Sequence, residues 1–409
     1  MLARIIKPRK LSCHFQLASR NYSDFSHVVI GGGVVGTAIA SELQKVSGNS
    51  VLLVEKNQGL GLETTSRNSE VIHAGLYYPP NSLKAQLCIK GKEKIYQAWD
   101  SDPNFKSQVP LRKCGKWVVA QSESEIEYLE KLSKNATDLK VPVSMISASM
   151  AAKKYPLIRA EAGALESHTT GIISAHDLTH YYQSVFEINE GTVSLNTTLK
   201  DIQFNQGVPN YTLNLFDDEN GEFEIQADNV INAAGLYAAE ISNLLLPNKI
   251  SPYFAKGTYF SFEPETPISS SKITEVLIYP CPNPNASSLG THLTFDLGGQ
   301  LRFGPDLEWL DIERAEQIDY TPSSDNLQAA YEAIKTYLPL ITPQALHPTY
   351  SGVRPKVVSE IENKKAFADF IIRDEKNQGF AGFVNLLGIE SPGLTASWSI
   401  ADYVRDIYH

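Results

Sequence analysis

The feature that most constrains the fold is the stretch VVIGGGVVGTAIA at residues 28–40. It follows the β-branched run HVVI and carries a Gly-x-Gly-x-x-Gly spacing at Gly31, Gly33 and Gly36. The first glycine permits a tight turn, the second lets the backbone approach a pyrophosphate, and the third allows a helix to pack closely on a strand. The stretch therefore predicts the first strand, turn and helix of a Rossmann-type unit.

The residues that follow continue the same unit. Apolar residues at helical spacing form one stripe after the glycines: Val35, Ala38, Ile39, Leu43 and Val46. The run SVLLVEK at 50–56 predicts a second strand that ends in Glu55. A carboxylate at this place accepts hydrogen bonds from an adenosine ribose and disfavours the 2′-phosphate of NADP. We therefore expect an adenine dinucleotide.

Composition limits the classes of protein that the chain can represent. Its 409 residues exceed one ordinary core and predict two domains or one two-lobed unit. The first 23 residues hold five basic residues and no acid, namely Arg4, Lys7, Arg9, Lys10 and Arg20. Because the formal net charge of the chain is −10, the remainder without these five carries −15. An acidic body of this kind argues against nucleic-acid binding.

The basic first 23 residues are typical of a mitochondrial targeting segment, and a disordered basic tail is the alternative. No later run reaches the ~18 consecutive apolar residues of a membrane span. We therefore expect a soluble or peripheral protein of the mitochondrial matrix or the inner-membrane face. The four cysteines (Cys13, Cys88, Cys114 and Cys281) have no metal-binding spacing, so we expect reduced thiols and no metal.

The segment at 59–88 bears on which dinucleotide binds. A nicotinamide domain would usually proceed to another helix and strand, whereas this segment offers small hydroxyl and polar side chains followed by HAG. With these residues in view, the chain resembles the D-amino-acid-oxidase-like family of FAD oxidoreductases, and within it the L-2-hydroxyglutarate dehydrogenase branch. The block TTSRNSEVIHAGLYYPPNSLKAQLC is similar to that branch. So are KCGKWVVA (113–120), GTYFSF (257–262), GTHLTFDLGGQLRFGP (290–305), YSGVRPK (350–356) and NLLGIESPGLTASWSIADYV (385–404).

The resemblance implies FAD as cofactor and an α/β fold in two lobes. A Rossmann-type FAD-binding domain would occupy 24–105, 151–252 and 346–409, and an inserted mixed-sheet substrate domain 106–150 and 253–345. The sequence is compatible with this layout. It predicts a strand, a turn at Gly235 and a helix within 228–245, a helix at 177–188, strands within 191–204, and a surface loop at 279–288. The segments 257–262 and 290–303 read as strands of the substrate sheet, and the chain ends in a helix.

The expected FAD-binding residues combine the glycine turn, the polar segment and the start of the last helix. They are Gly31, Gly33, Gly36, Glu55, Thr65, Ser66, Arg67, Asn68, Ser69, His73, Gly235, Gly388, Ser391, Gly393 and Leu394. Some relatives attach flavin covalently through a nearby histidine, and we expect no such link here. One departure from the family is Ser174, in TGIIS, where an Asp is usual. A serine still caps a helix, but it offers no carboxylate.

Oxidation of a 2-hydroxy acid requires a clamp for the carboxylate. Arg354 is the expected clamp, as the resemblance implies, because a planar guanidinium offers two parallel donors to a carboxylate. An interdomain ion pair is the alternative for this residue. Lys356 and Arg302 are weaker candidates for a second carboxylate.

The reaction also requires a base for the hydroxyl proton. His292 is the expected base because its ordinary pKa near ~6.5 lets it accept a proton, and a histidine satisfied within a sheet is the alternative. His73 is expected beside the flavin, to orient substrate, tune the flavin or act as the base. Tyr78, Tyr259 and Asn385 are candidate donors toward substrate, with packing roles as the alternative.

The resemblance, together with these residues, predicts an FAD-dependent dehydrogenase of L-2-hydroxyglutarate or a similar small 2-hydroxy acid. A quinone or another acceptor would receive the electrons. Two alternatives remain open at this point: an amine or amino-acid oxidase on the same scaffold, and a non-catalytic assembly factor of mitochondria.

Overall fold

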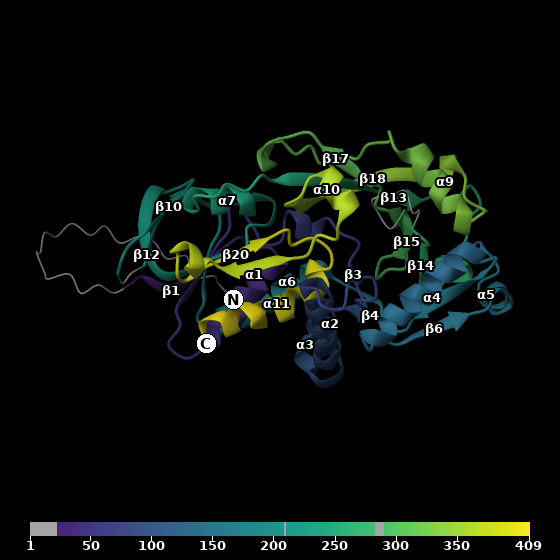
Figure 1. Cartoon of the computed structure of the whole chain (residues 1–409), viewed down its shortest axis with the longest axis horizontal. Helices are drawn as coiled ribbons and strands as arrows, with labels where there is room; N and C mark the ends of the chain where they lie inside the picture. The colour runs from purple at the N-terminus through teal and green to yellow at the C-terminus, as the bar shows by residue number, and fades with distance from the viewer. Residues whose placement is uncertain (1–22, 208–209, 283–289) are drawn as a thin grey trace, which may run out of the picture.

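The computed structural model describes residues 23–207, 210–282 and 290–409 (Figure 1). The predicted targeting segment, apart from Ser23, lies outside the described residues. The molecule is elongated, with one large sheet toward each end and a group of helices between and below them (Figure 1).

The first sheet has a parallel core at the heart of the predicted Rossmann unit. Its strands run in the order β9 (Thr192–Ser194), β2 (Val51–Val54), β1 (Phe25–Ile30), β12 (Gly221–Asn232) and β20 (Phe383–Leu387), with β19 (Ile371–Asp374) antiparallel at the edge. All four residues of β2 and the last four of β1 are buried. Strands buried on both faces read as continuous apolar runs, which is why HVVI and VLLV were recognisable.

Helices cover one face of this sheet. They are α1 (Val34–Gln44), α2 (Leu83–Ser101), α3 (Pro103–Gln108), α6 (Ala175–Ile188) and α11 (Gly393–Tyr408). Helix α11 packs against both α1 and α2, and α6 packs against α1. Ser174 caps α6 by accepting a hydrogen bond from the backbone N–H of Asp177, so the serine at this departure from the family supports the helix.

A small antiparallel layer covers the other face. Strand β10 (Thr197–Phe204) pairs with β11 (Tyr211–Asp217), and β11 pairs with the first half of β12. Helix α7 (Ala238–Leu245) packs beside β10. Their apolar side chains join those of β1 and β2 in one cluster that includes Val28, Leu52 and Leu213. The parallel core is therefore shielded from water on both sides.

The second sheet is mixed and has nine strands. Their order is β17 (Glu308–Leu310), β13 (Tyr253–Phe262), β16 (Leu301–Gly304), β15 (His292–Phe295), β14 (Leu277–Pro280), β5 (Lys116–Ala120), β7 (Gly163–Ser167) and β6 (Val143–Ile146), with β18 (Leu346–Lys356) paired along β13. Helices α4 (Glu123–Asp138), α5 (Ala148–Lys154) and α9 (Leu327–Tyr337) pack on it around Trp117 and Phe260. Short elements complete the chain: β3 (Val71–Ile72), β4 (Leu111–Arg112), β8 (Gly171–Ile173), α8 (Ser270–Ile273) and α10 (Glu360–Lys365).

The α/β class with a mixed second sheet is confirmed, and the division into two domains stays a prediction. Two predicted boundaries conflict with the pairing, because β7 and β18 belong to the second sheet although 151–252 and 346–409 were assigned to the FAD-binding domain. The predicted loop at 279–288 is wrong at its start. Tyr279 and Pro280 lie in β14, and Tyr279 is buried; residues 283–289 lie outside the described part.

The helix layer is held together by a close approach at Gly91. A Cβ on this residue of α2 would lie 2.2 Å from the carbonyl oxygen of Thr395 in α11. Backbone atoms cannot yield as a flexible side chain can, so only glycine fits here.

We expect Gly91→Ala to destabilise the protein by about 1–3 kcal/mol, because the clash outweighs the helix propensity that alanine adds. Denaturant unfolding of the holoprotein measures this. Gly59→Ala is the control, since a Cβ there would meet only the Leu62 side chain, at 3.7 Å. Equal stability of the two variants would contradict the packing argument.

Candidate active site

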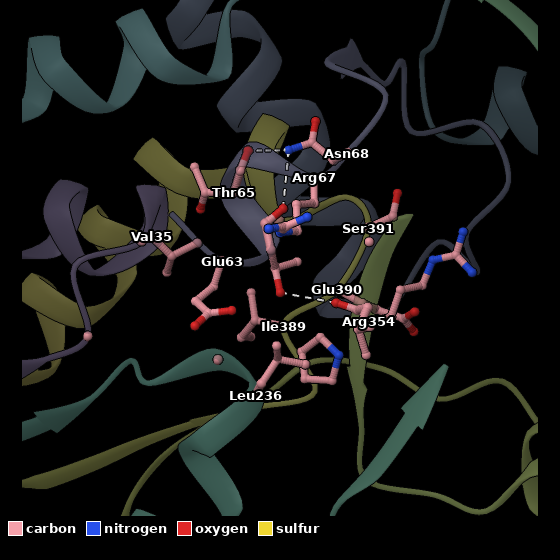
Figure 2. Close-up of a pocket in the computed structure, with 18 of the residues that line it drawn as sticks. Val35, Glu63, Thr65, Arg67, Asn68, Leu236, Arg354, Ile389, Glu390 and Ser391 are labelled. Carbon is pink, nitrogen blue, oxygen red and sulfur yellow. Dashed lines mark hydrogen bonds between the residues drawn. The ribbon is translucent and has the colours of Figure 1, made fainter. Parts of the chain in front are cut away.

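A large cavity of about 1000 Å³ runs between the two sheets. Its walls come from the β1–α1 turn, residues 61–73, the β12–α7 turn, strands β13, β15 and β18, and residues 389–394. Figure 2 shows Val35, Glu63 and Thr65 on one side of it and Arg354, Glu390 and Ser391 on the other. The cavity therefore joins the glycine turn to the residues expected to bind substrate.

The glycine turn has the geometry that a phosphate cradle requires. Gly31 has φ +105°, and a Cβ there would lie 2.6 Å from the carbonyl oxygen of Ala233 after β12. A Cβ on Gly36 would lie 1.9 Å from the carbonyl oxygen of Gly31, so the third glycine lets α1 pack onto the turn. Gly33 lines the cavity and would meet only the Thr65 hydroxyl, at 3.2 Å. The N-terminus of α1 thus faces open space, where its dipole favours an anion.

Glu55 is fixed at the end of β2 by two backbone donors. Its carboxylate accepts hydrogen bonds from the N–H of Gly32 (2.7 Å) and the N–H of Asn57 (2.8 Å), and the residue is only 7% exposed. Burial raises the pKa of Glu55, although both hydrogen bonds oppose the shift. Because each oxygen keeps a free lone pair beside the cavity, the carboxylate can accept from ribose hydroxyls.

The polar loop contributes most of the side chains expected of it. Thr65, Arg67, Asn68 and Ser69 line the cavity. The Arg67 guanidinium lies 4.1 Å over the Tyr320 ring, and its Nε is buried with no partner among the described residues. Ser66 does not fit the prediction: it lies outside the cavity lining, and its hydroxyl donates to the carbonyls of Leu62 and Glu63. The 3₁₀ turn at Thr64–Ser66 rotates it away.

The segment before α11 closes the cavity. Ser391, Gly393 and Leu394 line it, as does Gly235 with φ +56° at the turn after β12. Gly388 does not, because its left-handed backbone (φ +65°) turns the chain beside Val357 outside the main cavity. Pro392 offers no side-chain cap to α11. The N–H of Gly393 donates to the carbonyl of Glu390 (2.6 Å), so the next amides, those of Leu394 and Thr395, are the ones available near the cavity.

Arg354 projects from β18 as an unpaired cation. It lines the cavity and is half-buried, and it makes no side-chain hydrogen bond or ion pair with the described residues. The interdomain ion pair considered from sequence is therefore absent there. Tyr259 also lines the cavity, stacked on Tyr350 with ring centroids 4.5 Å apart, and burial raises its pKa. A guanidinium left without an acid in such a site is suited to bind a carboxylate ligand.

His292 lies on β15 with one ring nitrogen unused. Its ring stacks on Tyr279 with centroids 3.6 Å apart, and its Nδ1 is buried without a partner among the described residues. Burial holds the pKa of His292 well below its usual value, with further contributions from the charges of Lys116, His73 and Arg354. The ring is therefore neutral and able to accept a proton.

His73 also lines the cavity, but its ring is already engaged. Its Nε2 lies 3.1 Å from the Ser391 hydroxyl, and its backbone N–H donates to Thr395 Oγ1. Burial, followed by the charge of Lys116, lowers the pKa of His73 to about 3. Tyr78 lines the cavity close by, and burial raises its pKa well above the usual value. These contacts hold His73 in place beside the last helix.

Three residues form a buried charge cluster at the same end. Glu390 Oε1 lies 3.0 Å from Lys84 Nζ and 2.8 Å from Lys356 Nζ. Burial alone would raise the pKa of Glu390, but the positive charges of Lys84, Lys356 and Arg354 outweigh it and lower the pKa. Sequence reasoning missed Glu390 and Lys84. The signal for Glu390 was an acid among apolar residues immediately before the Ser-Pro-Gly helix start.

Two weaker candidates lie elsewhere. Arg302 lies outside the cavity lining and pairs with Asp296 at 3.0 Å. Asn385 is fully buried within the first sheet, where it bonds to Asn232, Ser242 and Glu375. Its amide supports the packing of the strands, and the residue does not line the cavity.

These features fit an FAD molecule. The cavity is long, it begins at a glycine turn with open space at Gly33, and it contains buried nitrogen atoms of Arg67 and His292 that await partners. The residues that would hold the group are the turn glycines, Glu55, the loop at 64–69 and the start of α11.

Comparisons with known proteins agree with this geometry. Residues 26–407 match the DAO family, described as FAD dependent oxidoreductase. The chain is 34% identical to the mitochondrial L-2-hydroxyglutarate dehydrogenase of Arabidopsis thaliana, over 93% of this chain and 82% of that protein. It is 26% identical to the L-2-hydroxyglutarate dehydrogenase of Indibacter alkaliphilus, over 93% of this chain and 98% of that protein.

Among solved structures, the FAD-bound, dithionite-reduced L-α-glycerophosphate oxidase of Mycoplasma pneumoniae superposes with a TM-score of 0.77. The two share 24% identity, and the match covers 94% of each chain. This likeness shows the fold.

We expect Glu55→Gln to weaken FAD binding roughly tenfold to hundredfold, because an amide nitrogen would face one of the two backbone donors and would donate where the ribose also donates. Titration of apoprotein with FAD, followed by absorbance, measures this. Glu42→Gln is the matched control, since Glu42 is also buried but bonds to Lys45 and Trp398 outside the cavity. Unchanged affinity in Glu55→Gln would remove the assigned role.

Proposed function

The chain belongs to the DAO family of FAD-dependent oxidoreductases, and on that premise we propose that it oxidises L-2-hydroxyglutarate to 2-oxoglutarate. The observation that carries the proposal is the excess of positive charge around the substrate end of the cavity. Arg354, Lys84 and Lys356 face a single carboxylate, Glu390. The group carries a net charge of +2, which a dicarboxylate neutralises.

The assignment of residues follows from their contacts. Arg354 would clamp the carboxylate next to the hydroxyl-bearing carbon, because its guanidinium is the cation of the group without a partner. Lys356 and Lys84 would attract the distal carboxylate while Glu390 keeps them in place. An amino acid brings an ammonium group into the same field, so the charge disfavours an amino-acid oxidase.

The chemical step needs a proton acceptor and an electron acceptor. FAD, when bound, supplies a two-electron acceptor for the hydride that leaves the carbinol carbon. His292 would accept the hydroxyl proton as the C=O bond forms, because its Nδ1 has no partner and burial keeps its ring neutral. His73 would position Ser391 and the start of α11. Residues of both sheets line the cavity and would limit the access of water to a bound substrate.

We further propose that the enzyme acts in mitochondria and passes its electrons to a quinone or a similar acceptor. The basic, acid-free start of the chain and the mitochondrial name of the Arabidopsis relative support this location. Within the described residues, no helix has the length and hydropathy to cross a bilayer. Contact with the inner membrane would be peripheral.

We expect L-2-hydroxyglutarate to bleach the yellow protein anaerobically, while L-lactate reacts at least about tenfold less efficiently because it lacks the second carboxylate. Stopped-flow absorbance of the oxidised protein measures this. sn-Glycerol 3-phosphate, also a dianion, and L-glutamate complete the panel. Bleaching by the phosphate ester or the amino acid alone would replace the proposal with that substrate class.

We expect Arg354→Lys to lower kcat/KM for L-2-hydroxyglutarate roughly tenfold to hundredfold, because a lysine cannot hold a carboxylate with two parallel donors. Arg302→Lys should change it little, since Arg302 bonds to Asp296 away from the cavity. Steady-state kinetics of both variants tests this. A clamp at Arg354 is refuted if both substitutions have the same effect.

A further inference from the structure

Lys116 is a buried lysine without an acidic partner. It lies on β5, is 1% exposed, and makes no hydrogen bond or ion pair with any described residue. Its Nζ lies 4.4 Å from the ring centroid of Tyr77 and 4.4 Å from that of Tyr279. Two aromatic faces attract an ammonium but do not neutralise it. A charge so costly to bury requires an explanation.

The position of Lys116 relates it to the expected base. Tyr279 connects the two residues: its ring lies under the Lys116 ammonium and stacks on the His292 ring, with ring centroids 3.6 Å apart. Together the two contacts put the ammonium within about 8 Å of the imidazole. Lys116 does not line the cavity, so it can act on a ligand only through its neighbours.

We propose that Lys116 is a positioning residue whose ammonium, acting across Tyr279, keeps the imidazole of His292 unprotonated and ready to accept the substrate's hydroxyl proton. The inference rests on the proposed function for the reaction that uses this base. It goes beyond that proposal because it assigns the protonation state of the base to a residue that substrate never touches.

The surroundings of both groups support the proposal. His292 is faced by Tyr279 from β14, Lys116 from β5, His73 from the segment after β3, and Arg354 from β18. Lys116 is faced by Tyr77, Tyr279, the two histidines and the Cys88 thiol of α2. No carboxylate is among these groups, so none of them screens the repulsion between an ammonium and an imidazolium.

The order of protonation follows from the burial of the two groups. Burial lowers the pKa of Lys116 to about 7, while the Cys88 thiol opposes the shift. Burial is also the largest cause of the lowered pKa of His292, and the charge of Lys116 lowers that pKa further. As the pH falls through about 7, Lys116 takes up a proton first, and its charge then opposes a proton on His292.

Replacing Lys116 by methionine removes this charge and tests the proposal. The pKa of His292 should rise by about one unit, since a unit charge within ~8 Å in a partly buried site produces a shift of this order. The acid limb of the pH profile, where kcat/KM for L-2-hydroxyglutarate falls as the pH decreases, should move to higher pH by the same amount. At a pH below the limb, the variant should retain about one-tenth of the wild-type value.

Three variants separate charge from structure. Lys116→Arg keeps a cation and should keep the wild-type limb, whereas Lys116→Gln, a second uncharged variant, should move it as methionine does. Lys92→Met is the matched control, because Lys92 is also buried and also lies near Cys88, but it contacts Thr169 and not the stacked pair. A limb that stays in place in both uncharged variants overturns the proposal, whatever happens to kcat.

A substrate-free readout separates this inference from the proposed function. In holoprotein labelled with ¹⁵N-histidine, the His292 ring, assigned through His292→Gln, should take up its proton at the pH of the acid limb in the wild type. In Lys116→Met, the protonated pattern of this ring should appear about one pH unit higher than in the wild type. If the ring titrates as expected but the protein turns over no hydroxy acid, only the proposed function is refuted. A ring that takes up its proton at the wild-type pH in both uncharged variants refutes only the Lys116 inference.

Discussion

The close approach of the β1–α1 turn to the end of β12 is the constraint on which the rest of the structure depends. Gly31 and Ala233 lie so near each other that a single added carbon would meet the neighbouring backbone, and Gly36 sits equally tightly on Gly31. This contact places the N-terminus of α1, the carboxylate of Glu55 and the turn at Gly235 around one opening. A chain that could not make it would have two sheets but no cradle between them.

The opposite end of the cavity is organised by charge. Glu390 holds two lysines within hydrogen-bonding distance and leaves Arg354 without a partner. Burying three cations with one anion costs stability, and the cost is recovered when an anionic ligand enters. The uncompensated charge is therefore a local weakness of the ligand-free protein and, under the function proposed above, the feature that would select a dicarboxylate.

The parts of the fold that were predictable from sequence are those with local patterns. The buried strands, the glycine turn, the helix at 177–188 and the strand–turn–helix around Gly235 all carry a short-range signal. The membership of β7 and β18 in the second sheet carries none, because pairing between distant strands is not encoded in either strand alone. At the site, Arg354 and His292 were predicted through a resemblance, and their roles stay predictions. Glu390, Lys84, Tyr279 and Lys116 were missed, since their importance comes from neighbours on other elements.

Strand β18 of the second sheet makes close contacts with the polar loop at residues 64–67. A Cβ on Gly352 would lie 2.0 Å from the carbonyl oxygen of Arg67, and the carbonyl of Val353 accepts a hydrogen bond from Thr64. Arg354 follows directly, facing the cavity, while Val353 packs with Phe254 and Leu236. Since side chains alternate along a strand, inserting or deleting one residue upstream within β18 would turn the guanidinium out of the cavity. The spacing along this strand therefore decides whether the guanidinium can reach the cavity at all.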